Sequence, residues 1–249
     1  MSTLLWLALP YVAFTSFALG HIWRYRYDQF GWTTRSSQPY ESRLLRLGSP
    51  LFHFGMLAVI GGHVMGILIP ASWTAAVGIS EGMYHFVSVS AGTMAGLATV
   101  AGLAVLLYRR ITVPAVRTAT TTNDKIMYAL LAAAIVTGMV NTVGENLIGG
   151  GYDYRSTVSP WFRSLFSLSP QPELMVGTPI SFQVHNVVVL ALLAIWPYTR
   201  LVHFFSAPLG YLIRPYIVYR SRDPQRRDER KYARAWETPS TPPVSRRRS

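Results

Sequence analysis

The stretch that most constrains the fold runs from Pro50 to Pro70, PLFHFGMLAVIGGHVMGILIP, and carries no charged side chain. About 20 apolar residues are enough to cross a hydrocarbon core of about 30 Å as a helix. The stretch nevertheless contains His53 and His63. An imidazole at membrane depth is costly unless it is paired, hydrated or bound, and metals are its commonest bound partners. Ten residues of helix correspond to a rise of about 15 Å, which suits two metals better than one shared metal.

The composition agrees with a membrane-embedded chain. Half of the 249 residues are hydrophobic and only 14% are charged, whereas about 25% are charged in an ordinary soluble domain. The formal net charge of +12 does not favour nucleic-acid binding, because the basic residues lie between apolar segments and in a C-terminal tail. The sequence contains no cysteine, which excludes disulfides, cysteine-ligated iron–sulfur clusters and covalently attached c-type haem.

Five apolar segments predict an all-α integral membrane protein, folded as a bundle of five transmembrane helices. The segments are approximately Thr3–Ile22, Pro50–Pro70, Met83–Leu107, Ile126–Ile148 and Pro179–Phe205. The first lacks a positive n-region and a clear cleavage site, so we expect a retained helix and not a signal peptide. We expect one membrane domain, residues 1–220, followed by a basic, disordered cytoplasmic tail, residues 221–249.

The lysines and arginines alternate between the connecting segments. Loops 24–49 and 108–125 hold five and four basic residues, whereas loop 71–82 holds none and loop 149–178 holds two. The tail after residue 205 holds eleven. The positive-inside rule therefore predicts that the N-terminus lies outside the cell and the C-terminus in the cytoplasm.

The second and fifth segments are then antiparallel, and the fifth carries His185 and His203. Antiparallel placement pairs His53 with His203 toward the cytoplasm and His63 with His185 toward the outside. Two stacked bis-histidine sites are the ligand set of a two-haem b-type cytochrome. The two histidines of the fifth segment are separated by a rise of about 27 Å, against about 15 Å on the second. We expect Pro197 to kink the fifth helix and shorten that span.

Two further positions lie near the predicted outer histidines. His85 opens the third segment beside Tyr84, and both a plain interfacial imidazole and a quinol contact are consistent with its place. Gly62 forms a GxxxG step with Gly66. Such a step serves close helix packing or leaves clearance for a flat porphyrin, and the adjacent His63 favours the second interpretation.

Three arginines lie at the predicted cytoplasmic edge of the bundle. They are Arg109, Arg110 and Arg200. They could pair with the propionates of an inner haem or simply anchor helix ends among the lipid headgroups.

Four stretches resemble the gamma (cytochrome b) subunit of respiratory membrane-bound nitrate reductase. They are RYRYDQFGWTTRSSQ at 24–38, LGSPLFHFGMLAVIGGHVMG at 47–66, RTATTTNDK at 117–125 and WPYTRLVHFFSAPLGYLIRPY at 196–216. The resemblance covers the chain to about Arg220. It implies that His53 and His203 bind the inner haem and that His63 and His185 bind the outer one, in agreement with the pairing reached from orientation.

The resemblance also implies a function in the cell membrane, where the chain is a multi-pass protein among lipids. Quinol, either menaquinol or ubiquinol, is oxidised near the outer haem, with Tyr84, His85 and Gly62 as candidate contacts. Family members can place a lysine at the start of the third helix, but EGMYHF has none, so Tyr84 or His85 would supply the polar contact. The resemblance further implies that the electrons pass to a cytoplasmic iron–sulfur (beta) subunit and then to a molybdenum-containing (alpha) subunit, which reduces nitrate.

Two alternatives remain open. The first is a related two-haem cytochrome that serves another cytoplasmic reductase, such as a heterodisulfide- or sulfite-reductase-like complex. The second is a small transporter or proton channel with a histidine relay, which predicts no bound chromophore and a path lined by polar residues. Beyond the histidines, Asn141 and Glu145 are the main polar residues that the apolar segments offer.

Overall fold

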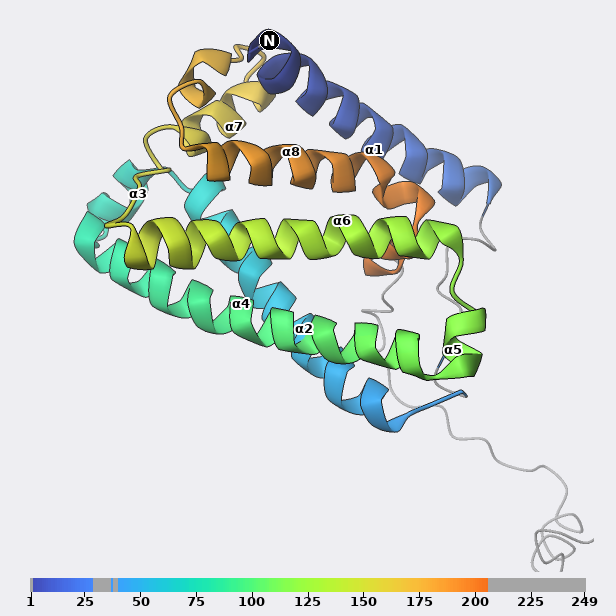
Figure 1. Cartoon of the computed structure of the whole chain (residues 1–249). Helices are drawn as coiled ribbons and strands as arrows, with labels where there is room; N and C mark the ends of the chain where they lie inside the picture. Colours follow the sequence, from blue (N-terminus) through green and yellow to red (C-terminus); the bar gives the residue numbers. More distant parts are fainter. Residues whose placement is uncertain (1, 29–36, 38–39, 206–249) are drawn as a thin grey trace, which may run out of the picture. The chain divides into compact units, whose positions relative to one another are not determined.

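A computed structural model of the chain describes residues 2–28, 37 and 40–205, and every regular element within these ranges is helical (Figure 1). Five of the described helices are long and apolar enough to cross a membrane: Leu4–Tyr27, Arg43–Leu68, Glu81–Thr112, Thr122–Ile148 and Ile180–Tyr198. The predicted all-α architecture with five spans is therefore confirmed, and the chain is a multi-pass membrane protein. The predicted tail, residues 221–249, lies outside the described residues.

The first two spans each join an α-helix to a π-helical segment. The first consists of η1 (Leu4–Ala8) and α1 (Leu9–Tyr27), and the second of α2 (Arg43–His63) and η3 (Val64–Leu68). Pro50 lies inside α2 and not at its start. A proline in a helix removes one backbone hydrogen bond, and here the helix continues on both sides of it.

The third and fourth spans begin with side-chain caps. The hydroxyl of Ser80 accepts a hydrogen bond from the backbone of Met83 at 3.2 Å at the start of α4 (Glu81–Thr112). A reciprocal capping box between Thr121 and Asp124 starts α6 (Thr122–Met139), which continues as the π-helical η4 (Val140–Ile148). Such caps satisfy backbone N–H groups that have no partner within the helix.

The fifth span ends earlier than its hydropathy suggests. Helix α8 (Ile180–Ile195) is followed by two 3₁₀ turns, η6 (Trp196–Tyr198) and η7 (Arg200–Phe204), with Thr199 extended between them. The prediction that Pro197 interrupts this helix is confirmed. The predicted continuation to Phe205 as one helix is wrong, because proline has no N–H to donate and the chain changes direction after it.

Four short helices connect the spans and were not predicted. They are α3 (Ala71–Ala76), α5 (Pro114–Thr118), α7 (Val158–Phe166) and η5 (Pro172–Met175). Helix α7 lies over the end of the second span, where Ser159 Oγ donates to the carbonyl of Gly66 at 2.8 Å and Arg163 donates to that of Ile67 at 2.8 Å. These side chains satisfy carbonyl groups that a helix end leaves without partners.

The long helices pack in the order α2, α4, α6, α8 and α1 (Figure 1). Glycines bring the backbones of α2 and α4 together, since a Cβ at Gly55 would lie 2.8 Å from the backbone nitrogen of Thr99. Close approach of this kind is usual where small residues line membrane helices. The outer surfaces remain apolar, with Phe54 and Ile148 both more than 70% exposed, as expected for side chains that face lipid.

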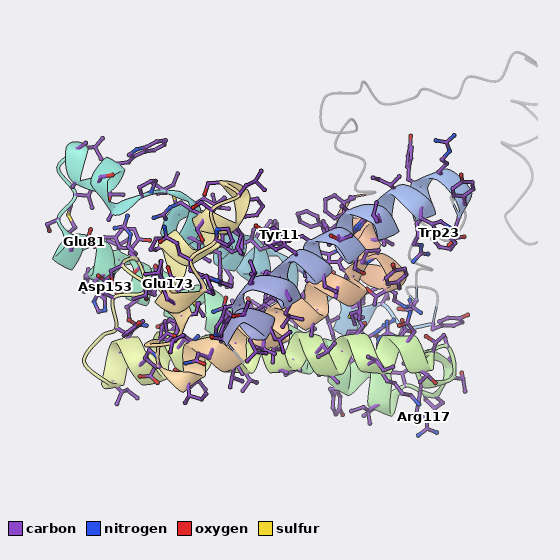
Figure 2. The ribbon with its side chains drawn as sticks, turned by 90° about the horizontal axis from the view of Figure 1, so that it is seen from above. Tyr11, Trp23, Glu81, Arg117, Asp153 and Glu173 are labelled. Atoms are coloured by element: carbon purple, nitrogen blue, oxygen red, sulfur yellow. The ribbon has the colours of Figure 1, made fainter. Side chains whose placement is uncertain are left out.

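Two hydrophobic clusters fill the interior of the described part. One is built from Trp6, Val158, Trp161, Leu165, Met175 and Phe182. The other is built from Leu103, Met127, Leu131, Ala134 and Leu192. Figure 2 shows Glu81, Asp153 and Glu173 at one end of the bundle and Trp23 and Arg117 at the opposite end. Arg117, from one of the two loops rich in basic residues, therefore lies at the end opposite the loops that hold few, in agreement with the alternation of lysine and arginine along the sequence.

Candidate functional site

The four histidines of the second and fifth segments meet in two pairs. His53 of α2 faces His203 of η7 with 5.9 Å between ring centroids and 73° between ring planes. His63, the last residue of α2, faces His185 of α8 at 6.2 Å and 34°. We name these the inner pair and the outer pair after the predicted orientation. They are the two pairs that antiparallel placement predicts.

The spacing within each pair suits one metal ion between the two rings. A bond of about 2 Å from the metal to each imidazole nitrogen, plus about 1 Å to each ring centre, separates opposed centroids by about 6 Å. The observed values of 5.9 and 6.2 Å agree with this expectation. A direct hydrogen bond between the two rings would place their centroids closer together than this.

Backbone carbonyls set the tautomer of the inner pair. Nδ1 of His53 lies 2.7 Å from the carbonyl oxygen of Ser49, and Nδ1 of His203 lies 2.6 Å from that of Arg200. A carbonyl oxygen can only accept a hydrogen bond, so Nδ1 carries the proton and Nε2 carries the lone pair. Metal-ligating histidines are commonly oriented in this way by a hydrogen bond at the second ring nitrogen.

The outer pair is oriented by one carbonyl and one hydroxyl. Nδ1 of His63 lies 2.8 Å from the carbonyl oxygen of Val59. Nδ1 of His185 lies 3.0 Å from the hydroxyl of Thr137, which itself donates to the carbonyl of Ala133 at 2.8 Å. Because the Thr137 proton is already used, the hydroxyl accepts from His185. Each ring therefore carries its lone pair on Nε2.

The donor set fits a haem better than a bare ion. Across the residues that the structure describes, no group of three or more His, Cys, Asp or Glu side chains could hold a metal ion. Two imidazoles are too few for a protein-bound ion such as zinc, which takes four ligands. Two imidazoles do, however, suit the iron of a haem, which they would hold between them.

The glycines next to His63 leave room for a flat group. A Cβ at Gly61 or Gly62 would meet nothing within 4 Å, so both glycines face open space next to His63 in the sequence. Gly66 differs, since a Cβ there would lie 2.5 Å from the hydroxyl oxygen of Tyr154. Of the two glycines in the predicted GxxxG step, Gly62 therefore faces open space and Gly66 is closely packed.

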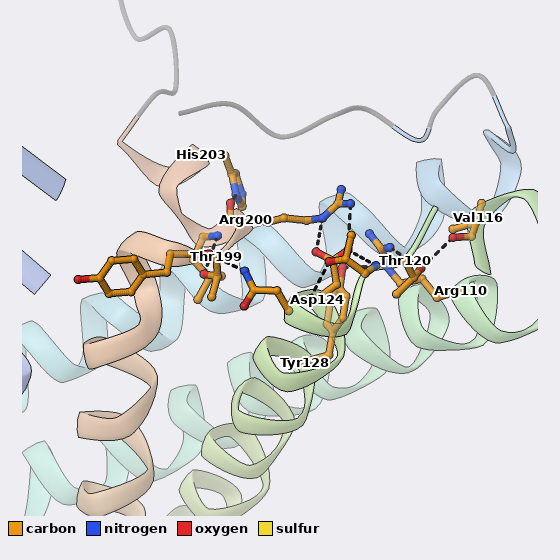
Figure 3. Close-up of polar contacts among 12 residues, drawn as sticks. Arg110, Val116, Thr120, Asp124, Tyr128, Thr199, Arg200 and His203 are labelled. Atoms are coloured by element: carbon orange, nitrogen blue, oxygen red, sulfur yellow. Dashed lines mark hydrogen bonds and ion pairs between the residues drawn. The ribbon is translucent and has the colours of Figure 1, made fainter. Parts of the chain in front are cut away.

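The inner pair depends on the irregular segment after α8, which several polar contacts hold in place (Figure 3). Asp124, buried at the start of α6, forms a two-point ion pair with Arg200. Asn123 donates to the carbonyl of Tyr198 at 2.5 Å, and the hydroxyl of Thr199 accepts from the backbone of Leu201 at 3.2 Å. These contacts position the turn that carries His203.

The three candidate propionate arginines all contact polar groups of the protein. Arg200 pairs with Asp124, and Arg110 donates to the hydroxyl of Tyr128 at 2.9 Å. Arg109 is buried and pairs with Glu41 at 2.6 Å. Desolvation opposes ionisation of Glu41, but a hydrogen bond from the Leu44 backbone and the Arg109 guanidinium together lower its pKa. A propionate contact for these arginines stays a prediction.

The predicted quinol contacts Tyr84 and His85 line a cavity of about 330 Å³ at the Glu81 end of α4. Gly150 and Gly151, with φ of 87° and 92°, turn the chain so that residues 152–155 lie opposite α4. The lining residues are Glu81, Tyr84, His85, Ser88, Gly150, Gly151, Tyr152, Asp153, Tyr154 and Arg155. The volume is within the range of small-molecule sites.

Sequence reasoning missed Tyr154 and Arg155, of which Arg155 is buried. Arg155 was counted only as one of the few positive charges of its loop. A signal was present in the run GGGYDYR, because glycines that permit positive φ precede aromatic and charged residues. The third predicted quinol contact, Gly62, is not in the lining and lies beside the outer pair.

Comparison with known proteins gives concordant results. Residues 2–222 match the family model described as nitrate reductase gamma subunit. The chain is 46% identical over 219 residues to the nitrate reductase gamma chain of Bacillus subtilis, covering 88% of this chain and 98% of that one. It is 33% identical over 214 residues to the respiratory nitrate reductase 2 gamma chain of Escherichia coli, covering 86% and 94%.

A longer relative is more similar in sequence. The chain is 57% identical over 224 residues to the nitrate reductase-like protein NarX of Mycobacterium tuberculosis. The match covers 90% of this chain but only 34% of the mycobacterial protein. The chain thus spans about a third of the length of that relative.

Proposed function

Because this chain belongs to the nitrate reductase gamma subunit family, we propose that it is the membrane cytochrome b subunit of a respiratory nitrate reductase. The proposal assigns one b-type haem to the inner pair, His53 and His203, and one to the outer pair, His63 and His185. The observation that carries it is the opposition of the two pairs at 5.9 and 6.2 Å between ring centroids. Bound haem would supply one-electron transfer.

The protein's own contribution is ligation and orientation. Nδ1 of every histidine of the two pairs has a hydrogen-bond partner, which puts the lone pair on Nε2, the nitrogen that would bind iron. The two imidazoles of each pair would hold the iron of a bound haem. We therefore assign electron conduction to this chain and nitrate reduction to another subunit.

The proposed orientation follows from charge. Arg117, from one of the basic loops, lies at the end of the bundle opposite Glu81, Asp153 and Glu173 (Figure 2), and the positive-inside rule supports a cytoplasmic location for the Arg117 end. The N-terminus is then outside and the C-terminus inside. A cytoplasmic iron–sulfur subunit would receive electrons near the inner pair and pass them to the molybdenum-containing subunit.

Quinol oxidation is proposed for the cavity at the outer end. Tyr84 and His85 are both part of its lining, and both carry polar groups able to hydrogen-bond a quinol hydroxyl. Oxidation of one quinol breaks two O–H bonds and releases two protons and two electrons. If the protons leave outside and the electrons leave inside, charge is separated across the membrane without a proton channel.

The histidine-relay alternative has weaker support. In the outer half of the fourth span, Glu145 accepts a hydrogen bond from Ser181 at 2.8 Å, and the amide of Asn146 donates to the carbonyl of Asn141 at 2.7 Å. The first contact joins the fourth and fifth spans, and the second lies within the fourth span. They do not connect the inner pair to the outer pair, as a proton path would require.

An optical spectrum of the purified chain tests the proposal. We expect dithionite to produce the bands of reduced b-type haem. We expect menadiol, a quinol, to produce the same bands without dithionite. A spectrum without such bands would exclude the cytochrome assignment. Haem that dithionite reduces but menadiol does not would retain the haem assignment and exclude quinol oxidation.

A further inference from the structure

The outer cavity contains a buried guanidinium group to which the proposed function gives no role. Arg155 is 6% exposed. Its Nη1 donates to both carboxylate oxygens of Glu81 at 3.2 and 3.3 Å, and its Nη2 donates to the hydroxyl of Thr74 at 3.0 Å. Its guanidinium carbon lies 3.9 Å from the ring centroid of Tyr84. Arg155 therefore fixes one acidic and one aromatic wall of the same cavity.

A pair of phenol groups leads from this cavity toward the outer histidines. The hydroxyls of Tyr84 and Tyr154 are 3.3 Å apart, and either can donate to the other. Burial raises the pKa of Tyr154, so its hydroxyl keeps its proton. The same hydroxyl packs on Gly66, which lies three residues beyond His63, or about 4.5 Å along the helix axis. Tyr154, part of the cavity lining, thus contacts the second span about one turn beyond His63.

Glu81 occupies the opposite, solvent-facing side of the cavity. Its side chain is 61% exposed although its partner Arg155 is buried, and it is the first residue of α4. A carboxylate in this position can reach the cavity and water together. Proton transfer needs an acceptor within reach of the reacting hydroxyl, either directly or through one water molecule.

We propose that Glu81, positioned by Arg155, is the group that receives the quinol protons in this cavity and releases them to water on the outer side. This inference rests on the proposed quinol oxidation. Two quinol O–H bonds break and two C=O bonds form. The two protons pass in turn through the Glu81 carboxylate. The two electrons pass singly to the oxidised one-electron carriers of the complex. Tyr84 and Tyr154 hydrogen-bond the quinol hydroxyl and direct it toward Glu81.

Six other titratable or charged groups face the same cavity and contribute to its pH response. They are Tyr84, His85, Tyr152, Asp153, Tyr154 and Arg155. A pH profile alone therefore does not identify Glu81. A substitution that removes only its carboxylate charge, compared with a matched substitution outside the cavity, isolates its contribution.

The experiment uses the complete reductase complex in liposomes, with menadiol as donor and nitrate as acceptor. Glu81→Gln is compared with Glu173→Gln, which alters an exposed carboxylate in η5, outside the cavity lining. Rates are expressed per haem reduced by dithionite, so that a loss of folded protein does not count as a loss of turnover. We expect Glu81→Gln to lower kcat about tenfold or more, with KM within about twofold, and Glu173→Gln to match the wild type.

Chemical rescue separates a missing proton acceptor from a structural defect. A high concentration of a small buffer such as formate can reach the exposed Glu81 position, so we expect it to restore most of the Glu81→Gln rate. Glu81→Asp, which retains a carboxylate, should keep most of the wild-type kcat. The proposal is overturned if Glu81→Gln turns over like Glu173→Gln, or if its rate is low and formate does not raise it. If menadiol does not reduce the haem of the wild-type complex, the proposed quinol oxidation itself is wrong.

Discussion

The inner and outer histidine pairs hold their two rings at nearly the same separation, but different elements and contacts hold the rings in place. In the outer pair, His63 and His185 both lie on regular α-helix, and Thr137 orients the second ring from a neighbouring helix. In the inner pair, only His53 lies on a regular helix. His203 lies on a 3₁₀ turn beyond Pro197, which the Asp124–Arg200 ion pair holds against the start of α6.

The difference shows how two helices with unequal histidine spacing can form two pairs of equal separation. Ten residues separate the histidines of α2, whereas eighteen separate those of the fifth span. A continuous helix would place His203 far beyond the level of His53. The break after Ile195 removes this excess, and polar contacts then replace the helical hydrogen bonds that the break removes.

The largest effect is expected when one histidine of each pair is replaced, in two separate variants. Because the pairs have separate supports, we expect His63→Ala and His53→Ala each to lower the haem content from about two to about one per chain. Haem per protein and a potentiometric titration of the purified complex measure which haem is lost. His85→Ala serves as the control and should keep both haems. Full haem content in either ligand variant would contradict the assignment.

A smaller effect should appear when the support of the inner pair alone is weakened. Asp124→Asn keeps a side-chain acceptor for the α6 cap but removes the charge that faces Arg200. We expect a loss of about 2–3 kcal/mol of stability, because Asp124 is buried, together with weaker retention of the inner haem and an unchanged outer haem. Haem absorbance during thermal unfolding measures both.

The neighbouring Lys125→Gln provides the control for that experiment. Lys125 is exposed, so its substitution should change stability by no more than about 0.5 kcal/mol. Equal effects from both variants, or equal loss of both haems from Asp124→Asn, would mean that the ion pair does not specifically support the inner pair.

The smallest expected effect concerns the outer pair, and the question is whether Gly62→Ala weakens retention of the outer haem although alanine should stabilise the helix. Replacing a glycine within a helix by alanine ordinarily stabilises the helix by about 1 kcal/mol, and a methyl group at Gly62 meets no protein atom within 4 Å. If a porphyrin lies there, we expect Gly62→Ala to weaken retention of the outer haem. Gly82→Ala, also in open space, should leave both haems in place. Full retention in Gly62→Ala would exclude a porphyrin close to this glycine.

Hydropathy and charge were sufficient to predict the five spans, and antiparallel placement was sufficient to predict which histidines meet. These features are local or follow from one orientation rule. The course of the chain after Pro197 was only partly predictable. A proline signals that a helix is interrupted, but the position of His203 depends on Asp124, 79 positions earlier in the sequence.

The partners of the charged residues could not be predicted. Arg109 pairs with Glu41, 68 residues away, and Arg155 pairs with Glu81 across the outer cavity. Nothing in a single sequence specifies such distant pairs. Helix α7 was also missed, because it is only nine residues long and therefore much shorter than the apolar segments that mark a membrane span.

The contacts of α7 with the end of the second span also have a consequence for protein engineering. Ser159 and Arg163 complete the hydrogen bonding of Gly66 and Ile67, so the terminus of one membrane helix is finished by a loop about 90 residues later in the chain. A minimal version cut down to the apolar spans alone would leave these carbonyls bare beside His63. Any truncated or grafted scaffold that aims to keep the outer pair must therefore retain residues 152–166.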